Sequence, residues 1–255
     1  MAIVKNIIPI LEFDTDRTAV INPAHEKLDL KLPKKCVFAF LGEYISEYAI
    51  KAGAVKVSEF RSMTKLYPVY VTKYKGEDIT LCEAPVGSAA SAQILDWLIG
   101  YGVSEIISSG SCGALERFAE STFLVPCKAM RDEGTSYHYA PPSRFMEISE
   151  KARRAIKDTV SEHGMKYQEV ITWSTDGFFR ETKDKVAYRK SEGCSVVEME
   201  CSALAAVSAF RGATWGMILY TADSLADVDK YDERNWGGNA YEYALTLCLD
   251  AVLKL

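Results

Sequence analysis

Apolar and polar positions alternate along the chain in two rhythms, and these rhythms predict its secondary structure. Short apolar runs rich in β-branched and aromatic residues, typical of strands, occur at 36–41, 67–74, 77–85, 103–110, 121–130, 167–175 and 213–223. Apolar residues at helical spacing occur at 88–102, 145–163, 196–212 and 239–255. Strands separated by helices predict an α/β fold.

Lys75-Gly76 lies between two of the strand-like runs, 67–74 and 77–85, and predicts an antiparallel hairpin. A hairpin among helix-connected strands makes the sheet mixed rather than purely parallel. No low-complexity linker and no internal repeat divides the chain, so we expect a single domain over 1–255. Residues 1–34 are polar and interrupted by prolines, and we expect them to wrap its surface. The prediction is therefore one α/β domain with a mixed β-sheet flanked by helices.

Composition argues against several classes of protein. Apolar residues make up 48% of the chain and charged residues 25%, as in a globular protein with a sizeable core. The net charge of -5 offers no basic footprint for nucleic acid or for an anionic membrane. No stretch approaches the ~20 apolar residues of a membrane span, and the opening "MAIVKNIIPILEFDTDR" turns polar too soon for a signal peptide. We expect no nucleic-acid or membrane partner and a cytoplasmic location.

The cysteines and histidines give no sign of a disulfide framework or a metal site. The seven cysteines are odd in number, scattered, and form no CxxC pair, which favours buried reduced thiols. The three histidines, His25, His138 and His163, lie far apart, and no cluster of His, Cys and acidic residues has ligand spacing. We expect no metal and no organic cofactor.

The segment "SSGSCGAL" (108–115) follows a predicted strand and is the first candidate for ligand binding, since ligands of such sheets sit beyond the carboxyl ends of strands. Gly110 and Gly113 allow the backbone to turn several N–H groups toward one anion, helped by the Ser111 hydroxyl. The alternative is a tight turn without a ligand. Cys112 has no histidine near it in sequence, so a small buried residue is expected there rather than a nucleophile.

Two further strand ends carry candidate chemistry. Phe178 and Phe179 lie in the polar turn "STDGFFRET" (174–182), where exposed aromatics indicate stacking on a planar base or packing on a neighbouring helix. Asp223 follows an almost wholly apolar strand. Burial there raises a carboxyl pKa toward the range of a general acid, whereas the alternative is a helix N-cap.

The segment "VVEMECSALAAVSAFRG" (196–212) has the pattern of a small-residue core helix with acids in its first turn. Glu198 and Glu200 flank Met199 at that start. The free N–H groups and the dipole of a helix N-terminus stabilise negative charge, so two carboxylates are tolerated there. Their presence in an apolar segment still calls for a function.

These segments, in this order, resemble the nucleoside phosphorylase family, which comprises the trimer- and hexamer-forming purine nucleoside and uridine phosphorylases. The resemblance rests on "GSCGA", "GFF", "VEMECSALAAVSAFRG", "TADSLAD" and the loop "RDEGTSYHY" (131–139), and it spans roughly 36–255. It implies an enzyme of purine salvage, a pentosyltransferase. The implied reaction is phosphate-dependent cleavage of a purine ribonucleoside to free base and ribose 1-phosphate, with inorganic phosphate as co-substrate.

The resemblance assigns a role to each candidate residue. Glu200 corresponds to the glutamate that binds the ribose 2′ and 3′ hydroxyls, with Met199 against the sugar and Glu198 in a structural role. Phe178 corresponds to the aromatic that stacks on the base, and Asp223 to the acid that protonates N7 of a purine. The implied site is catalytic Asp223 and Arg234, substrate-binding Glu200, Met199, Phe178, Ser111, Cys112 and Gly113, and phosphate-binding Gly42, Arg61, Gly110 and Ser111.

The chain departs from the family at the phosphate site. Ser46 and Ser108 stand where two of three phosphate-binding arginines are expected, and Glu43 stands near an expected aspartate. Arg180 or Arg131 would have to substitute. Arg234 is only the nearest counterpart of the arginine that assists the acid.

The missing arginines leave the nucleophile open. A phosphate-independent nucleoside hydrolase, a uridine phosphorylase and a non-catalytic nucleoside-binding protein remain as alternatives. Arg61 matches the arginine that a neighbouring subunit supplies, so the resemblance also implies a homotrimer or homohexamer with sites at subunit interfaces.

Overall fold

The computed structural model describes residues 3–255 and shows one mixed sheet, which confirms the predicted fold class. Its strands are β1 (Lys35–Ala39), β2 (Val55–Arg61), β3 (Leu66–Tyr74), β4 (Glu77–Glu83), β5 (Glu105–Ala114), β6 (Phe123–Asp132), β7 (Phe145–Glu147), β8 (Gln168–Thr175), β9 (Cys194–Glu198) and β10 (Thr214–Ser224). They run in the order β10-β6-β8-β9-β5-β1-β4-β3-β2, with β7 beside β6. Because β10 also pairs with β5, the strands β10, β6, β8, β9 and β5 close into a ring.

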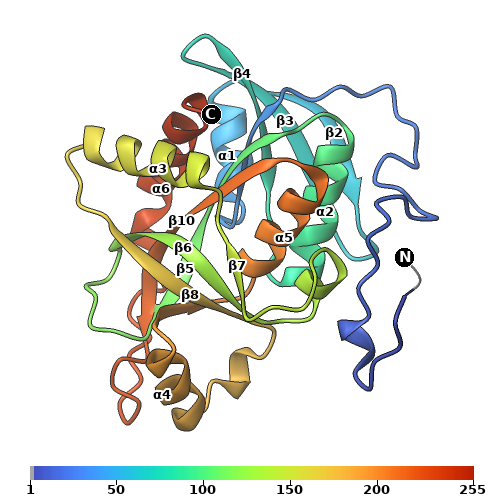
Figure 1. Ribbon diagram of the computed structural model, residues 1–255. Helices are drawn as coiled ribbons and strands as arrows, with labels where there is room; N and C mark the ends of the chain where they lie inside the picture. The colour runs from blue at the N-terminus through green and yellow to red at the C-terminus, as the bar shows by residue number, and fades with distance from the viewer. Residues whose placement is uncertain (1–2) are drawn as a thin grey trace.

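Helices cover both faces of this sheet (Figure 1). They are α1 (Tyr44–Lys51), α2 (Ser88–Gly100), α3 (Glu150–Glu162), α4 (Lys183–Ser191), α5 (Cys201–Arg211) and α6 (Tyr241–Leu253). The helices α2 and α5 pack together over one face with a core that includes Leu95 and Leu204. On the opposite face, α3 and α6 pack together over a second core that includes Ile156 and Leu245. The sheet is therefore buried on both sides, as the near-continuous apolar runs of its parallel strands require.

Most predicted elements appear, and two predicted helices begin later than their patterns indicated. The hairpin at Lys75-Gly76 is confirmed, since β3 and β4 pair antiparallel. The stretch 145–163 opens with the strand β7, and α3 begins only after Ser149, whose hydroxyl caps it by accepting from the Ala152 N–H. The stretch 196–212 is likewise divided, because Cys194–Glu198 forms β9 and α5 begins at Cys201. Short apolar runs do not separate strand from helix by periodicity alone.

The segment 3–34 contains one short 3-10 helix, η1 (Pro9–Leu11), and runs along the edges of α2 and α5. Its contacts include Glu26 to the Trp97 indole, Leu32 N–H to the Tyr101 carbonyl, and the Arg17 carbonyl to Arg211. Within residues 3–255, no helix is both long and apolar enough to cross a membrane.

Candidate active site

A cavity of about 420 Å³ lies at the carboxyl ends of β5, β9 and β10. Parallel strands direct their last residues and the following loops to one edge, so this is where the fold collects polar groups. The residues around the cavity are Phe40, Val86, Gly110, Ser111, Cys112, Gly113, Phe178, Glu181, Val197, Glu198, Met199, Glu200, Asp223 and Trp236. Eight of the predicted site residues are therefore brought together here.

Glu198 ends β9 with its carboxylate buried and fully engaged. One oxygen accepts from the Glu200 and Cys201 N–H groups at 2.7 Å each, where α5 begins. The other accepts from the Ser174 hydroxyl at 2.6 Å and the Thr172 hydroxyl at 3.1 Å. Glu198 thus stabilises the start of α5, in the structural position that the sequence indicated.

Glu200 is the N-cap residue of α5, but its side chain turns away from that helix toward the cavity. Its Oε1 accepts from the Gly87 N–H at 2.5 Å, at the start of α2. Burial, and next the charge of Glu198, raises the pKa of Glu200 to about 8. The Glu200 carboxyl has two oxygens with two lone pairs each, so it can still accept hydrogen bonds from a ligand, and two vicinal hydroxyls suit such a carboxyl.

Asp223 lies one residue before the end of β10, 6% exposed, with its Oδ2 accepting from the Tyr231 hydroxyl at 3.1 Å. Burial raises the pKa of Asp223, while the Tyr231 hydrogen bond and the Arg234 charge lower it. The alternative that Asp223 caps a helix is wrong. The strand continues to Ser224, and the next helical element along the chain begins only at Gly238. A buried carboxyl at a cavity edge is in position to deliver a proton.

The segment Gly110–Gly113 is extended, so the predicted anion-binding turn does not form. Both glycines belong to β5, which pairs with β10 through Gly110 and with β9 through Gly113. Both positions favour glycine because a larger side chain would be crowded by its neighbours. A Cβ on Gly110 would lie 3.1 Å from Met217 Cε, and one on Gly113 would lie 3.0 Å from Val197 Cγ1. Ser111 is exposed in the cavity wall.

Cys112 is buried beside Ser111, and burial raises the pKa of its thiol well above the ordinary value. A protonated thiol in this setting is a poor nucleophile. This agrees with the structural role expected from the sequence.

Phe178 lies on the cavity in the 3-10 turn η3 (Phe178–Arg180), 42% exposed, while its neighbour Phe179 is 92% exposed. The two rings meet edge to face with centroids 5.0 Å apart. Phe178 therefore presents an aromatic surface at the cavity, as stacking on a planar base requires.

Glu181 is a cavity residue that sequence reasoning missed. Burial, and next the charge of Asp223, raises the pKa of Glu181 to about 7. Glu181 also borders a smaller adjoining cavity of about 150 Å³ that Tyr231 lines on another side. The acid in "GFFRET" was a local signal for Glu181, whereas nothing in the sequence marked Tyr231.

Three predicted residues lie away from the cavity wall. Arg234 donates to the Phe118 carbonyl at 2.7 Å and the Ala222 carbonyl at 3.4 Å, so its guanidinium is engaged by the backbone. Gly42 lies in the turn before α1 with φ +56°. Arg61 ends β2 at the surface and pairs with Glu59 at 3.1 Å.

No lysine, arginine or histidine is among the described residues that line the cavity. Ser108 is sealed in the core, where its hydroxyl accepts from the Trp215 indole at 3.0 Å. Arg131, a predicted substitute, is buried and donates to Ser136, Ala140, Pro141 and Ser143. Arg180, the other, is exposed and does not line the cavity. The cavity of one chain is therefore bordered by four carboxyl groups and no cation.

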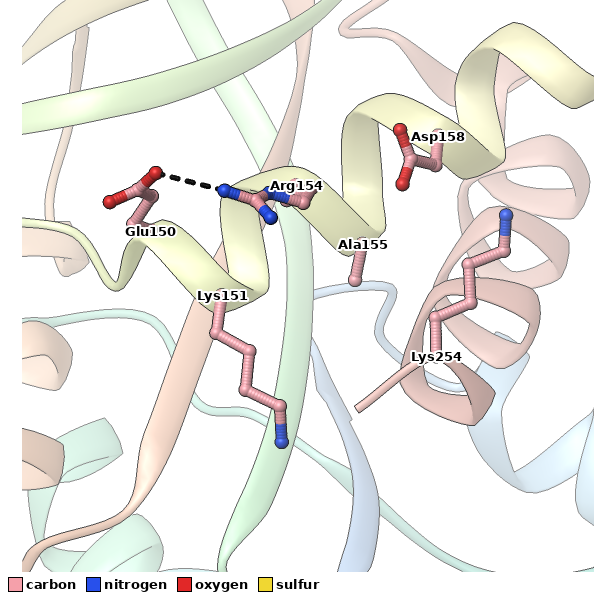
Figure 2. Close-up of a pocket in the computed structure, with 6 residues that line it drawn as sticks. All are labelled: Glu150, Lys151, Arg154, Ala155, Asp158 and Lys254. Atoms are coloured by element: carbon pink, nitrogen blue, oxygen red, sulfur yellow. Dashed lines mark hydrogen bonds and ion pairs between the residues drawn. The ribbon is translucent and has the colours of Figure 1, made fainter.

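A second hollow, of about 340 Å³, opens between α3 and the C-terminal end of α6 (Figure 2). Its basic side chains are paired within the chain: Lys151 with Glu105, Arg154 with Glu150 and Lys254 with Glu162. With its charges balanced, this hollow lacks the convergent polar groups of the first cavity. Over residues 3–255, no group of three His, Cys, Asp or Glu side chains is arranged to hold a metal ion.

Comparison with known proteins shows which family this chain belongs to. Residues 35–254 match the family model described as the phosphorylase superfamily. Guanosine phosphorylase of Halorubrum lacusprofundi is 24% identical over 162 residues, 63% of this chain and 67% of that protein. The 5'-methylthioadenosine/S-adenosylhomocysteine nucleosidase of Buchnera aphidicola is 28% identical over 152 residues, 55% of this chain and 65% of that protein. These matches span about two thirds of each relative.

Among solved structures, uridine phosphorylase from Vibrio fischeri superposes with a TM-score of 0.76 at 23% identity, covering 88% of this chain and 93% of that one. This likeness shows the shared fold. The names of these proteins include both phosphorylases and a nucleosidase.

Proposed function

The chain belongs to the phosphorylase superfamily, and from that premise we propose that it cleaves the N-glycosidic bond of a purine ribonucleoside and releases the free base. The observation that carries the proposal is the convergence of Glu200, Asp223 and Phe178 on one cavity from three separate segments of the chain. They supply a carboxyl for hydroxyl groups, a buried acid and an aromatic face. A non-catalytic binding protein would not need the buried acid.

Each group has a defined task in this reaction. Glu200 accepts the ribose 2′ and 3′ hydroxyls and holds the sugar, while Phe178 stacks on the base. Asp223 donates its proton to N7, so that the base leaves as a neutral species. The carboxyl oxygens around the cavity carry negative partial charge and stabilise the positive charge that develops on the ribosyl carbon.

Asp223 favours a purine over uridine because a pyrimidine has no N7 to receive the proton. The guanosine phosphorylase and the nucleosidase among the relatives act, by their names, on purine-containing compounds. The resemblance to uridine phosphorylase is a likeness of fold.

The cavity of one chain favours water as the nucleophile. A phosphate dianion there would face Glu181, Glu198, Glu200 and Asp223 with no cation among the lining residues described. Anion binding in proteins relies on charge-assisted hydrogen bonds, usually from arginine, or on clustered N–H groups, and the extended β5 provides no such cluster. Water carries no charge and needs no cation to bind.

Phosphorolysis, the reaction predicted from the sequence, is the second candidate. The observation that favours it is the exposure of Arg61 at the end of β2, where it is available to the cavity of a second copy of the chain. In that case the homotrimer or homohexamer predicted from the family resemblance completes the site.

The test is base release from guanosine, inosine, adenosine and uridine, with and without inorganic phosphate. Hydrolysis gives free ribose at a rate independent of phosphate, whereas phosphorolysis gives ribose 1-phosphate and requires it. Arg61→Ala is expected to leave hydrolysis unchanged and to abolish phosphorolysis. The matched control is Lys73→Ala, at an exposed position on β3. Absence of base release from every nucleoside would refute the proposal.

A further inference from the structure

Asp223 is held by a neighbour that the family resemblance did not indicate. Its Oδ2 accepts the Tyr231 hydroxyl at 3.1 Å. Its Oδ1 faces β5, where a Cβ built on Gly113 would lie only 3.3 Å from it. The two oxygens are therefore distinct: one is engaged by a donor and the other is directed to the cavity wall.

The segment that carries Tyr231 is fixed to the strand that carries Asp223. Ser224 and Asp232 exchange backbone hydrogen bonds of 2.8 and 3.2 Å in an antiparallel bridge. These residues are the immediate neighbours of Asp223 and Tyr231, so the bridge sets the two side chains against each other. Arg234 reinforces it by binding the Ala222 and Phe118 carbonyls.

We infer that Tyr231, and not Arg234, is the positioning residue for the proton donor Asp223. This inference rests on the proposed function. Because the Tyr231 hydroxyl donates to Oδ2, the transferable proton resides on Oδ1, the oxygen that faces Gly113 in the cavity wall. In the reaction the Oδ1–H bond breaks and an N7–H bond forms. The N9–C1′ bond breaks with its electron pair left on the base, and C1′ bonds to the oxygen of the attacking water or phosphate. When water attacks, its extra proton passes to solvent.

Tyr231 also stabilises the product of that step. Asp223 is left as a carboxylate, and a hydrogen bond to the charged form strengthens the acid. The other groups acting on Asp223 are the Arg234 charge and the carboxyl of Glu181 across the cavity, with the Cys112 thiol on β5. Among the described side chains only Tyr231 donates a hydrogen bond to the Asp223 carboxyl, and the backbone N–H of Asp223 itself is a second donor to that carboxyl.

The test compares Tyr231→Phe with Tyr243→Phe, the same chemical change at an exposed position on α6. The pH dependence of kcat/KM is measured with the best natural purine nucleoside and with its 7-methylated form, which needs no proton at N7. For Tyr231→Phe we expect the value of kcat/KM on the low-pH plateau to fall on the order of 10-fold with the natural substrate. The descending limb should move to higher pH, because the pKa of Asp223 rises when the hydrogen bond is lost. The 7-methylated substrate and the control variant should be unaffected.

Carbon-13 NMR titration of the Asp223 carboxyl gives a readout that does not depend on activity, and it should show the same rise in pKa. Equal slowing of both substrates with an unmoved limb would overturn the inference and leave Tyr231 a packing residue. Base release by the wild type separates this failure from failure of the proposed function, since a wild type inactive on every nucleoside refutes both.

Discussion

Glu198→Ala is expected to destabilise the fold far more than Glu200→Ala, although the two acids are only two residues apart. Glu198 accepts four hydrogen bonds, two of them from the Glu200 and Cys201 N–H groups at the buried start of α5. Alanine leaves those N–H groups without an acceptor, while the two hydroxyls can rotate to other partners. An orphaned buried donor costs about 1–3 kcal/mol, so two cost roughly 2–6 kcal/mol.

Part of this cost is offset because burial already disfavours the charged form of Glu198 and raises its pKa. We therefore expect a net loss of about 2–4 kcal/mol, against a total stability of about 5–15 kcal/mol for a typical protein. For a chain of this size that corresponds to a fall in Tm on the order of 10 °C. Glu200 accepts one backbone hydrogen bond from Gly87, and burial, which raises its pKa to about 8, makes its charge unfavourable in the fold. Its removal should therefore destabilise the fold far less than Glu198→Ala does, or stabilise it, while abolishing turnover.

The assay is urea unfolding at pH 7 followed by tryptophan fluorescence, since Trp173 and Trp215 are fully buried reporters. A Glu198→Ala midpoint within error of the wild type, or an equal loss for Glu200→Ala, would refute the reasoning. In either case the carboxylate of Glu198 would not be what stabilises the start of α5.

Three other predictions follow from the same site. Asp223→Asn should slow natural purine nucleosides by ~10²–10⁴-fold but spare 7-methylated ones, whereas Glu200→Gln should slow both alike, as steady-state rates with each pair will show. The unfolding free energy should fall as pH rises from 4.5 toward about 8, because Glu200 in the folded chain keeps a proton that it has lost in the unfolded chain. Urea titrations at several pH values measure this dependence, and Glu200→Gln should flatten it. Prolonged chelation should leave turnover unchanged, and activity lost to a chelator and restored by a metal would show that prediction to be wrong.

The sequence by itself determined the order of most strands and helices and the main polar groups of the site. It did not indicate α1, β2 or α4, nor the strands β7 and β9 that open two predicted helices. Asp223 was identifiable because an apolar run ends beside it, and Phe178 because an exposed aromatic in a polar turn is costly. These signals are local: hydrophobic periodicity and the chemistry of a strand end are written within ten or so residues. The family resemblance, confirmed by the family match over 35–254, added the roles that local signals do not carry.

Only the tertiary structure decided which neighbours these groups meet. The pairing of β10 with β5 joins residues about a hundred positions apart, and it turns the glycine segment 110–113 into a strand rather than an anion-binding turn. Arg234 binds backbone carbonyls instead of the cavity, and the bridge between Ser224 and Asp232 brings Tyr231 to Asp223. Which distant strands pair depends on the packing of the whole sheet against its helices, so a pattern within ten or so residues does not determine it. That is why Glu200, Asp223 and Phe178 were predictable from the sequence. Tyr231, Glu181 and the absence of a cation among the described cavity residues emerged only from the fold.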